Sequence, residues 1–341
     1  MKRHAAFCMC AMALVFFLSP GAPGLRHAAA APEVTWDLPH FCSPNYYIAK
    51  DLVQFAKAVE TKTNGQFNIV VHAGSSLLKG PQVAPALVAG RVPIGPILAP
   101  YVYDLFPRIA VLYLPFSTSS LQELRTLAEN MRGYFYGVLE ERNLKPLFMY
   151  AWPTQQIFSL EPMDTVASCK GKKVRLFNAE HAALCKKIKA APTNIAFSEV
   201  YTALQRGTVD AFITSNTNIP VMKFYEVAKY ANQWTINGGG VEFICVNMKA
   251  WNKLPEKYQK ALLQVVEETK IEEKIWADAV KMDEASIGEM KAKGMKILYP
   301  KKAEIERMKE LSIGVWDKWA EKYGTQDLLK KVKATLVEIH R

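Results

Sequence analysis

The chain has 341 residues, of which 50% are hydrophobic and 22% are charged, and its formal net charge is +11. This length is typical of two domains and leaves room for a sizeable core. The composition excludes a disordered chain, a collagen-like repeat and a short disulfide-stapled scaffold, but its basic balance is compatible with nucleic-acid binding.

The first 31 residues have the pattern of a secretory signal peptide. A basic end precedes an uncharged, mostly apolar run from Ala5 to Leu18, and small residues follow. The run is too short to span a bilayer, which needs about 20 apolar residues, so we expect cleavage near Ala30 or Ala31 rather than a retained anchor. The expected mature protein is periplasmic and carries a net charge of +8, because the leader contains three basic residues and no acid.

Strand and helix patterns alternate in the first half of the mature chain. The strands are expected over Val34–Leu38, Gln66–His72, Ile109–Leu114 and Leu147–Tyr150. The helices are expected over Ile48–Val59, Val83–Ala89 and Leu121 to about Arg142. Asn64-Gly65 and Gly90 supply the stop signals after the first two helices.

The second half repeats this alternation. Its strands are expected over Lys172–Leu176, Val209–Ile213, Val241–Asn247 and Met295–Leu298. Its helices are expected over Glu180–Lys189, Phe197–Gln205 and Pro255 to about Lys291, with charged helices up to the C-terminus. Short strands separated by helices predict an α/β fold with a mainly parallel sheet. Gly238–Gly240 precedes a strand and not a helix, so we interpret it as a flexible connection rather than an anion cradle.

The positive charge does not indicate nucleic acid. Most of the excess lysine lies after Leu254 and alternates with glutamate, as in Lys270 to Lys274, which is typical of a solvated helix face. Zinc fingers and aromatic RNA-binding motifs are absent from the sequence. So are the common enzyme signatures, including the GxSxG elbow, HExxH, the Walker loop and GxGxxG, and we therefore expect neither catalytic residues nor a cofactor.

Four cysteines remain after the predicted cleavage: Cys42, Cys169, Cys185 and Cys245. They could form two disulfides with three possible connectivities, or they could be buried structural residues. The sequence does not decide between these alternatives. No CxxC pair or zinc-type spacing is present, so no metal site is predicted.

One arginine is placed where α/β proteins bind ligands. Arg175 lies near the carboxyl end of the strand that begins at Lys172, and a helix starts just after Asn178. Ligands bind outside the carboxyl ends of such strands, and a guanidinium there can hold a carboxylate through two parallel hydrogen bonds. On its own this pattern is weak, because surface arginines after strands are common.

The residues around Arg175 strengthen it. Three segments follow one another in the chain: Gly171-Lys-Lys-Val-Arg175, Phe197-Ser-Glu-Val-Tyr-Thr-Ala-Leu-Gln-Arg-Gly-Thr-Val-Asp210 and Lys223-Phe-Tyr-Glu-Val227. Together with Thr63-Asn-Gly65, Leu114-Pro-Phe116 and Trp251-Asn-Lys-Leu-Pro255, they resemble the solute-binding proteins of TRAP (tripartite ATP-independent periplasmic) transporters, the dicarboxylate-binding P-subunit family. The resemblance covers essentially the whole mature chain, and the segment from Phe197 to Asp210 is the most specific part.

The resemblance implies a type II periplasmic-binding-protein-like α/β fold with two α/β lobes. Crossing strands and a long helix would join the lobes, and the ligand would bind in the cleft between them. Lobe 1 would contain residues 32–153 plus 240–282, and lobe 2 residues 154–239 plus 283–341. The resemblance also implies that the solute is delivered to integral-membrane TRAP permease subunits, driven by an ion gradient.

Site residues are carried over one by one. The family's carboxylate-binding arginine falls on Arg175, a polar contact on Asn178 and a pocket aromatic on Phe197. Three positions depart from the family pattern: a second arginine is replaced by Gln155, an asparagine by Thr214 and an aspartate by Pro93. Gln155 and Thr214 are expected to contact the ligand in place of the family's residues. Without the second arginine, one cation remains to pair with one carboxylate, which argues against a dicarboxylate or a sialic-acid-like ligand.

Aromatic residues crowd the segments expected at the cleft. They are Phe41, Tyr46, Tyr47, Tyr101, Tyr103, Trp152, Phe177, Phe212 and Trp234, of which we expect about half to be core. The others, with Tyr101, Trp152 and Phe41 foremost, would form an apolar pocket for a monocarboxylate with a hydrophobic or aromatic body. Such ligands include aromatic or branched-chain keto, hydroxy and amino acids. The alternatives are a C4-dicarboxylate binder, a protein that presents its ligand to a sensor, and an exported enzyme on a similar frame.

Overall fold

The computed structural model describes residues 31–176 and 178–339. The predicted signal peptide and Phe177 lie outside the described residues. All of the helices and strands described below belong to one compact unit, which begins at Pro32.

Two small sheets share the first part of this unit. Strands β1 (Val34–Pro39) and β2 (Phe67–His72) pair in parallel, and helix α1 (Tyr47–Lys62) connects them. The other sheet is antiparallel with the order β3–β10–β4, formed by β3 (Ile94–Leu98), β10 (Gly240–Asn247) and β4 (Leu144–Trp152). The helical segments between these strands are α2 (Gly80–Val88), η1 (Ala99–Tyr101), η2 (Ile109–Tyr113), α3 (Leu121–Asn130) and α4 (Arg132–Glu140).

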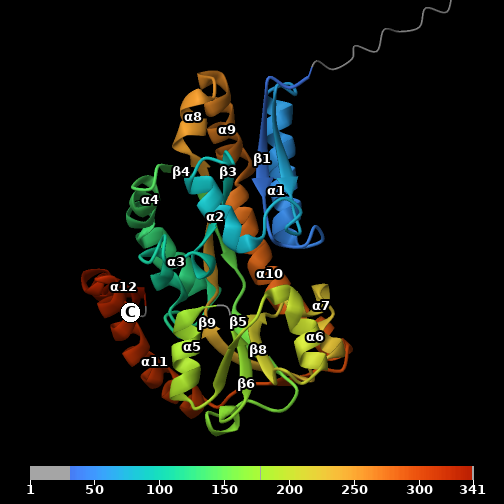
Figure 1. The fold of residues 1–341 in the computed structure, drawn as a ribbon, viewed down its shortest axis with the longest axis vertical. Coiled ribbons are helices and arrows are strands. Elements are labelled where there is room, and N and C mark those ends of the chain that lie inside the picture. Colours follow the sequence, from blue (N-terminus) through green and yellow to red (C-terminus); the bar gives the residue numbers. More distant parts are fainter. Residues whose placement is uncertain (1–30, 177, 340–341) are drawn as a thin grey trace, which may run out of the picture. The chain divides into compact units, whose positions relative to one another are not determined.

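A six-stranded mixed sheet, in the order β11–β9–β5–β8–β6–β7, forms the second part (Figure 1). Its strands are β5 (Gln155–Ser159), β6 (Lys173–Leu176), β7 (Ala191–Asn194), β8 (Ala211–Ser215), β9 (Tyr230–Asn237) and β11 (Lys296–Leu298). The intervening segments are η3 (Ala167–Cys169), α5 (Ala179–Lys187), η4 (Phe197–Glu199), α6 (Val200–Gln205), α7 (Asn218–Val221) and η5 (Phe224–Glu226).

The chain passes between the three-stranded and six-stranded sheets at two adjacent places. Strand β4 leads into β5 through residues 153–154, and β9 leads into β10 through Gly238 and Gly239. The second crossing is close-packed: a Cβ on Gly238 would lie 2.3 Å from the Ser120 carbonyl oxygen, and one on Gly239 2.5 Å from that of Trp152. The interpretation of these glycines as a flexible connection is therefore wrong. They are required because no side chain fits between the crossing backbones.

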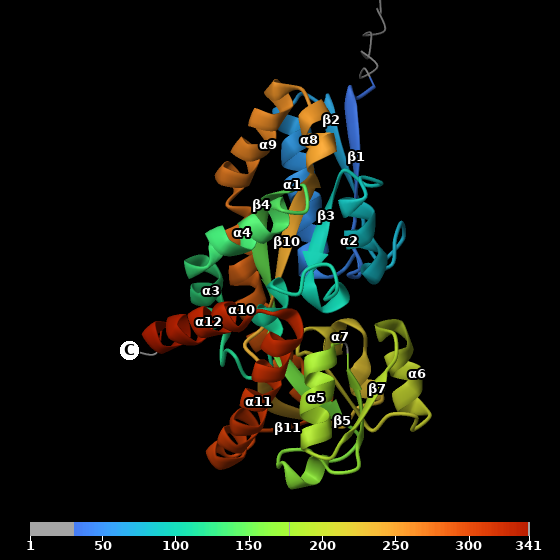
Figure 2. The same cartoon turned by 60° about the vertical axis from the view of Figure 1, so that its left-hand side comes forward.

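Five helices complete the unit: α8 (Met248–Lys253), α9 (Glu256–Thr269), α10 (Ile271–Ala292), α11 (Lys302–Tyr323) and α12 (Gln326–Ile339). Helix α10 packs against β4 and α1 and also against α7 and β11, so it bridges elements of both parts (Figures 1 and 2). Helix α12 packs on α3, which places the last helix against an element of the first part.

Local signals in the sequence explain several boundaries. Helix α1 buries one face, including Leu52, Phe55 and Val59, and its chain reverses at Asn64 and Gly65, which have φ angles of 51° and 76°. The single long helix expected after Pro255 is broken at Lys270, whose φ of 47° separates α9 from α10.

Other expectations are wrong. The apolar run at Ile109 forms the 3₁₀ helix η2 instead of a strand, because all five residues are buried and such a run carries no period that separates strand from helix. The helix expected from Leu121 breaks at Met131 into α3 and α4. The prediction of a mainly parallel sheet also fails, because β10 is antiparallel to both of its neighbours and β5 to both of its own. The periodicity did not reveal β3, β5, β7 and β9.

The four cysteines of the described residues are free and buried. Cys169 and Cys185 lie in one hydrophobic cluster with Val174 and Leu184, whereas Cys42 and Cys245 belong to two different clusters. Among the described residues the structure thus favours buried structural cysteines over disulfides.

Candidate functional site

Arg175 is buried at the carboxyl end of β6. Its side chain is only 4% exposed, and it lies directly opposite Phe212 of the parallel strand β8. The Nε atom donates a hydrogen bond of 3.1 Å to the Ile195 carbonyl oxygen, and the guanidinium carbon is 5.4 Å from the centroid of the Phe197 ring. Burial lowers the pKa of Arg175 to about 10, although the neighbouring Tyr101 opposes this shift. The protein therefore holds a strongly desolvated cation next to an aromatic ring.

Asn178 follows Arg175 and caps the N-terminus of α5. Its Oδ1 atom accepts a hydrogen bond of 2.7 Å from the His181 backbone N–H. Its Nδ2 atom is buried and has no hydrogen-bond partner among the described residues. A buried amide without a partner is unfavourable, so this N–H group is available to donate to a ligand oxygen.

Three of the predicted aromatic residues form a contact group. The rings of Phe41 and Trp152 are stacked with centroids 5.2 Å apart, and the Tyr101 ring meets the edge of Phe41 at 5.2 Å. Tyr46 stacks on Trp152 at 5.4 Å. Phe41 and Tyr101 follow the carboxyl ends of β1 and β3, and Trp152 ends β4, so strand ends bring the rings together. Phe212 and Trp234, in contrast, are wholly buried core residues.

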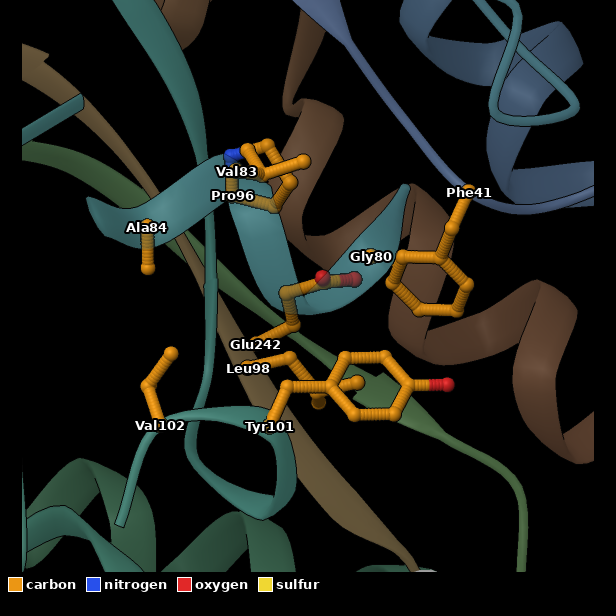
Figure 3. Close-up of a pocket in the computed structure, with 9 residues that line it drawn as sticks. All are labelled: Phe41, Gly80, Val83, Ala84, Pro96, Leu98, Tyr101, Val102 and Glu242. Carbon is orange, nitrogen blue, oxygen red and sulfur yellow. The ribbon is translucent and has the colours of Figure 1, made fainter. Parts of the chain in front are cut away.

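A buried carboxylate lies beside this aromatic group. Glu242 of β10 is 0% exposed, and its Oε2 atom accepts hydrogen bonds from Trp152 Nε1 at 2.8 Å and from the Tyr150 hydroxyl at 2.7 Å. The Nε2 atom of His40 lies 3.3 Å from the same oxygen. Figure 3 shows the Glu242 carboxylate among Phe41, Gly80 and Tyr101. These residues line a cavity of about 10 Å³, which is room for one water-sized group.

Tyr101 connects the two charged side chains. Burial raises its pKa, Arg175 lowers it and Glu242 raises it, so the hydroxyl lies in the electrostatic field of both residues. The Tyr101 ring also packs so tightly on Gly80 that a Cβ there would lie 2.8 Å from it. Tyr101 therefore packs on Gly80 and lies in the field of both charged groups.

The remaining two predicted residues lie on opposite faces of the six-stranded sheet. Thr214 is two residues beyond Phe212 on β8, so it shares the face of Arg175; its Oγ1 accepts a hydrogen bond of 2.9 Å from Asn218. On β5, Gln156 pairs with Thr214, so the preceding residue, Gln155, lies on the other face of the sheet. The Gln155 amide donates a hydrogen bond of 2.8 Å to the Pro153 carbonyl oxygen. Thr214 thus shares a sheet face with Arg175, and Gln155, which pairs with Ser215 at the carboxyl end of β8, lies at the same edge of the sheet.

Sequence reasoning did not single out Glu242 or His40. A signal existed for Glu242, because it is one acid in an otherwise apolar strand from Val241 to Val246.

No group of three or more His, Cys, Asp or Glu side chains suited to a metal occurs within residues 31–176 and 178–339. Within the same ranges, no helix is both long and apolar enough to cross a membrane.

Comparison with known proteins gives a consistent result. Residues 38–322 match the model of the bacterial extracellular solute-binding proteins, family 7 (DctP). A solute-binding protein of Roseobacter denitrificans is 27% identical over 240 residues, covering 70% of this chain and 73% of the relative. The C4-dicarboxylate-binding periplasmic protein DctP of Rhodobacter capsulatus is 26% identical over 91% of this chain and 93% of its own.

A solved structure shares the fold. An extracytoplasmic solute receptor of Bordetella pertussis that binds pyroglutamic acid superposes with a TM-score of 0.81 at 24% identity, covering 88% of this chain and 99% of the receptor. The α/β architecture with the bridging helix α10 is therefore that of the TRAP periplasmic binding proteins. Since the family model spans most of the chain, the protein belongs to the DctP family of TRAP solute-binding proteins, bacterial extracellular solute-binding proteins of family 7, which bind solutes and do not catalyse reactions.

Proposed function

We propose that this protein captures a small monocarboxylate with a hydrophobic or aromatic body and delivers it to the membrane permease subunits of a TRAP transporter. The observation that carries the proposal is Arg175, a buried guanidinium at a strand end whose charge is desolvated and which contacts the Phe197 ring. Exported to the periplasm after removal of residues 1–31, the protein would present this site to solutes there.

The geometry above supports each proposed ligand contact. Arg175 pairs with the ligand carboxylate, and Asn178 donates its buried Nδ2 hydrogen to the same group. Phe197 forms one wall beside the guanidinium. Tyr101, Trp152 and Phe41 form the opposite, aromatic wall. Thr214 shares the sheet face of Arg175 and borders the site, and the uncharged Gln155, opposite Ser215 at the carboxyl end of β8, leaves this edge of the sheet without a second cation.

Lobe closure would enclose the ligand. The proposed lobes are residues 32–153 plus 240–282 and residues 154–239 plus 283–341, joined at the two strand crossings and by α10. Helix α12 packs on α3, so the C-terminus would return from the second lobe to the first. A direct link between the lobes is the hydrogen bond of 2.6 Å between the Tyr46 hydroxyl and Thr217 Oγ1.

A thermal-shift screen of residues 32–341 against organic acids tests this proposal. Because a ligand that binds only the folded state stabilises it, monocarboxylates with apolar bodies should raise the melting temperature. C4-dicarboxylates should not, since a second carboxylate would need a cation that Gln155 does not supply. Stabilisation by dicarboxylates alone would contradict the proposed ligand, and the same would hold if no acid stabilised the protein.

A gene neighbourhood that encodes a receptor instead of permease subunits would favour the sensor alternative.

A further inference from the structure

The carboxylate of Glu242 is only half satisfied by the protein. Tyr150, Trp152 and His40 all approach its Oε2 atom. The Oε1 atom is buried and has no hydrogen-bond partner among the described residues. Burying a charged oxygen without a donor is strongly unfavourable, so a carboxylate retained in this way needs a further donor.

Glu242 lines a cavity next to the aromatic group. Glu242 lines this cavity together with Phe41, Gly80 and Tyr101, and its other lining residues are apolar (Figure 3). The volume of about 10 Å³ accommodates one group the size of water, which is also the size of an ammonium or hydroxyl group. Glu242 is the charged residue of the cavity lining, so the cavity favours a hydrogen-bond donor over an acceptor.

The cavity adjoins the proposed ligand site. Phe41 and Tyr101 line it, and the same two rings, in contact with each other, belong to the proposed aromatic wall. A ligand whose carboxylate is held by Arg175 and whose body passes along Tyr101 would therefore direct its next polar group towards Glu242.

We propose that Glu242 is a specificity-determining residue whose Oε1 atom accepts a hydrogen bond from an N–H or O–H group carried by the ligand. This inference rests on the proposed function and narrows it to amino and hydroxy acids. Keto acids are disfavoured, because a keto oxygen would face the carboxylate with no proton between them.

Calorimetric titration with matched ligand sets tests the inference. Within each set the ligands share one hydrophobic body and one carboxylate. The aromatic set consists of phenylalanine, phenyllactate, phenylpyruvate and 3-phenylpropionate. The branched set consists of leucine and the hydroxy, keto and unsubstituted acids with the leucine side chain. In whichever set binds, the donor-bearing members should bind at least tenfold more tightly than the keto and unsubstituted acids. Equal affinity within a binding set overturns the role of Glu242 but leaves the proposed function intact. If neither set binds, both are overturned.

Substitution of Glu242 provides a second readout. E242Q keeps an oxygen for Tyr150 and Trp152 but can place its amide N–H₂ towards the cavity. It should weaken amino acid binding at least tenfold, weaken hydroxy acid binding less, and improve keto acid binding, because the amide donates to the keto oxygen. Y150F is the matched control: it removes a donor to Oε2 and should lower stability without changing the order of ligand preference. An unchanged order in folded E242Q would contradict the inference.

Discussion

Replacing Arg175 should stabilise the ligand-free protein while it weakens ligand binding. Burial lowers the pKa of Arg175 from 12.5 to about 10, and at 1.36 kcal/mol per unit this corresponds to a cost of about 3 kcal/mol for holding the charge in place. R175M removes that cost and keeps an unbranched apolar chain. It also leaves the Ile195 carbonyl oxygen without its 3.1 Å hydrogen bond, which costs about 1 kcal/mol, and removes the guanidinium from the Phe197 ring, which costs about 1 kcal/mol more.

The net expectation for R175M is a gain of about 1 kcal/mol in the free energy of unfolding, a rise in melting temperature of roughly 1–2 °C. The affinity for the ligand should fall roughly 10- to 150-fold, because a hydrogen bond to a charged group contributes about 1.5–3 kcal/mol. Chemical denaturation measures the first quantity and calorimetric titration the second.

R206M is the matched control, because Arg206 is exposed and lies in the same segment of the second part. It should change neither quantity appreciably. If R175M lowers the stability as much as an ordinary core substitution, the desolvated state of Arg175 is refuted. If R175M binds the ligand as the unchanged protein does, its role as the carboxylate partner is refuted.

Three further predictions follow from single features. Burial raises the pKa of Asp283 from 3.8 to about 6, so the folded state loses up to about 3 kcal/mol of stability as the pH rises from about 4 to 6. D283N should abolish this loss in a pH series of denaturation curves. An unaltered pH profile would contradict the prediction. G240A places a Cβ 2.3 Å from the Tyr113 ring and should destabilise the protein by about 1–3 kcal/mol. The control is G133A, whose Cβ meets nothing within 4 Å and which should be neutral or stabilising in the same denaturation assay. The four buried thiols of Cys42, Cys169, Cys185 and Cys245 should not react with maleimide at neutral pH in the folded protein beginning at Pro32. Burial also raises the pKa of Cys169 and of Cys185 to about 12. Full labelling before denaturation would contradict this prediction.

Local patterns were sufficient to predict much of the fold. The amphipathic period of α1, the stop at Asn64-Gly65 and the strand that carries Arg175 all depend on neighbours in sequence, and the structure has them. The run at Ile109 was misassigned because uniform hydrophobicity fits any fully buried backbone. Strand β10 was found, but its antiparallel pairing to β3 and β4 depends on residues about 150 and about 100 positions away, respectively, and no local signal encodes it.

The candidate site was predictable to a similar extent. Arg175 and Asn178 stand at a strand end and a helix start, positions that the sequence reveals. Gln155 was assigned to the site through the family resemblance, and the register of β5 on β8 places it at the carboxyl end of β8, on the opposite sheet face from Arg175, which the sequence alone does not reveal. Glu242 could not be linked to the site because its significance lies in contacts with Tyr150 and Trp152, which come together only in the folded sheet.

The decisive measurement is a crystal structure of residues 32–341 with the tightest-binding acid from the screen. We predict that the ligand carboxylate lies within hydrogen-bond distance of the Arg175 guanidinium, with the ligand body between Phe197 and the rings of Tyr101, Trp152 and Phe41. A ligand carboxylate held elsewhere, with Arg175 still bonded only within the protein, would contradict it.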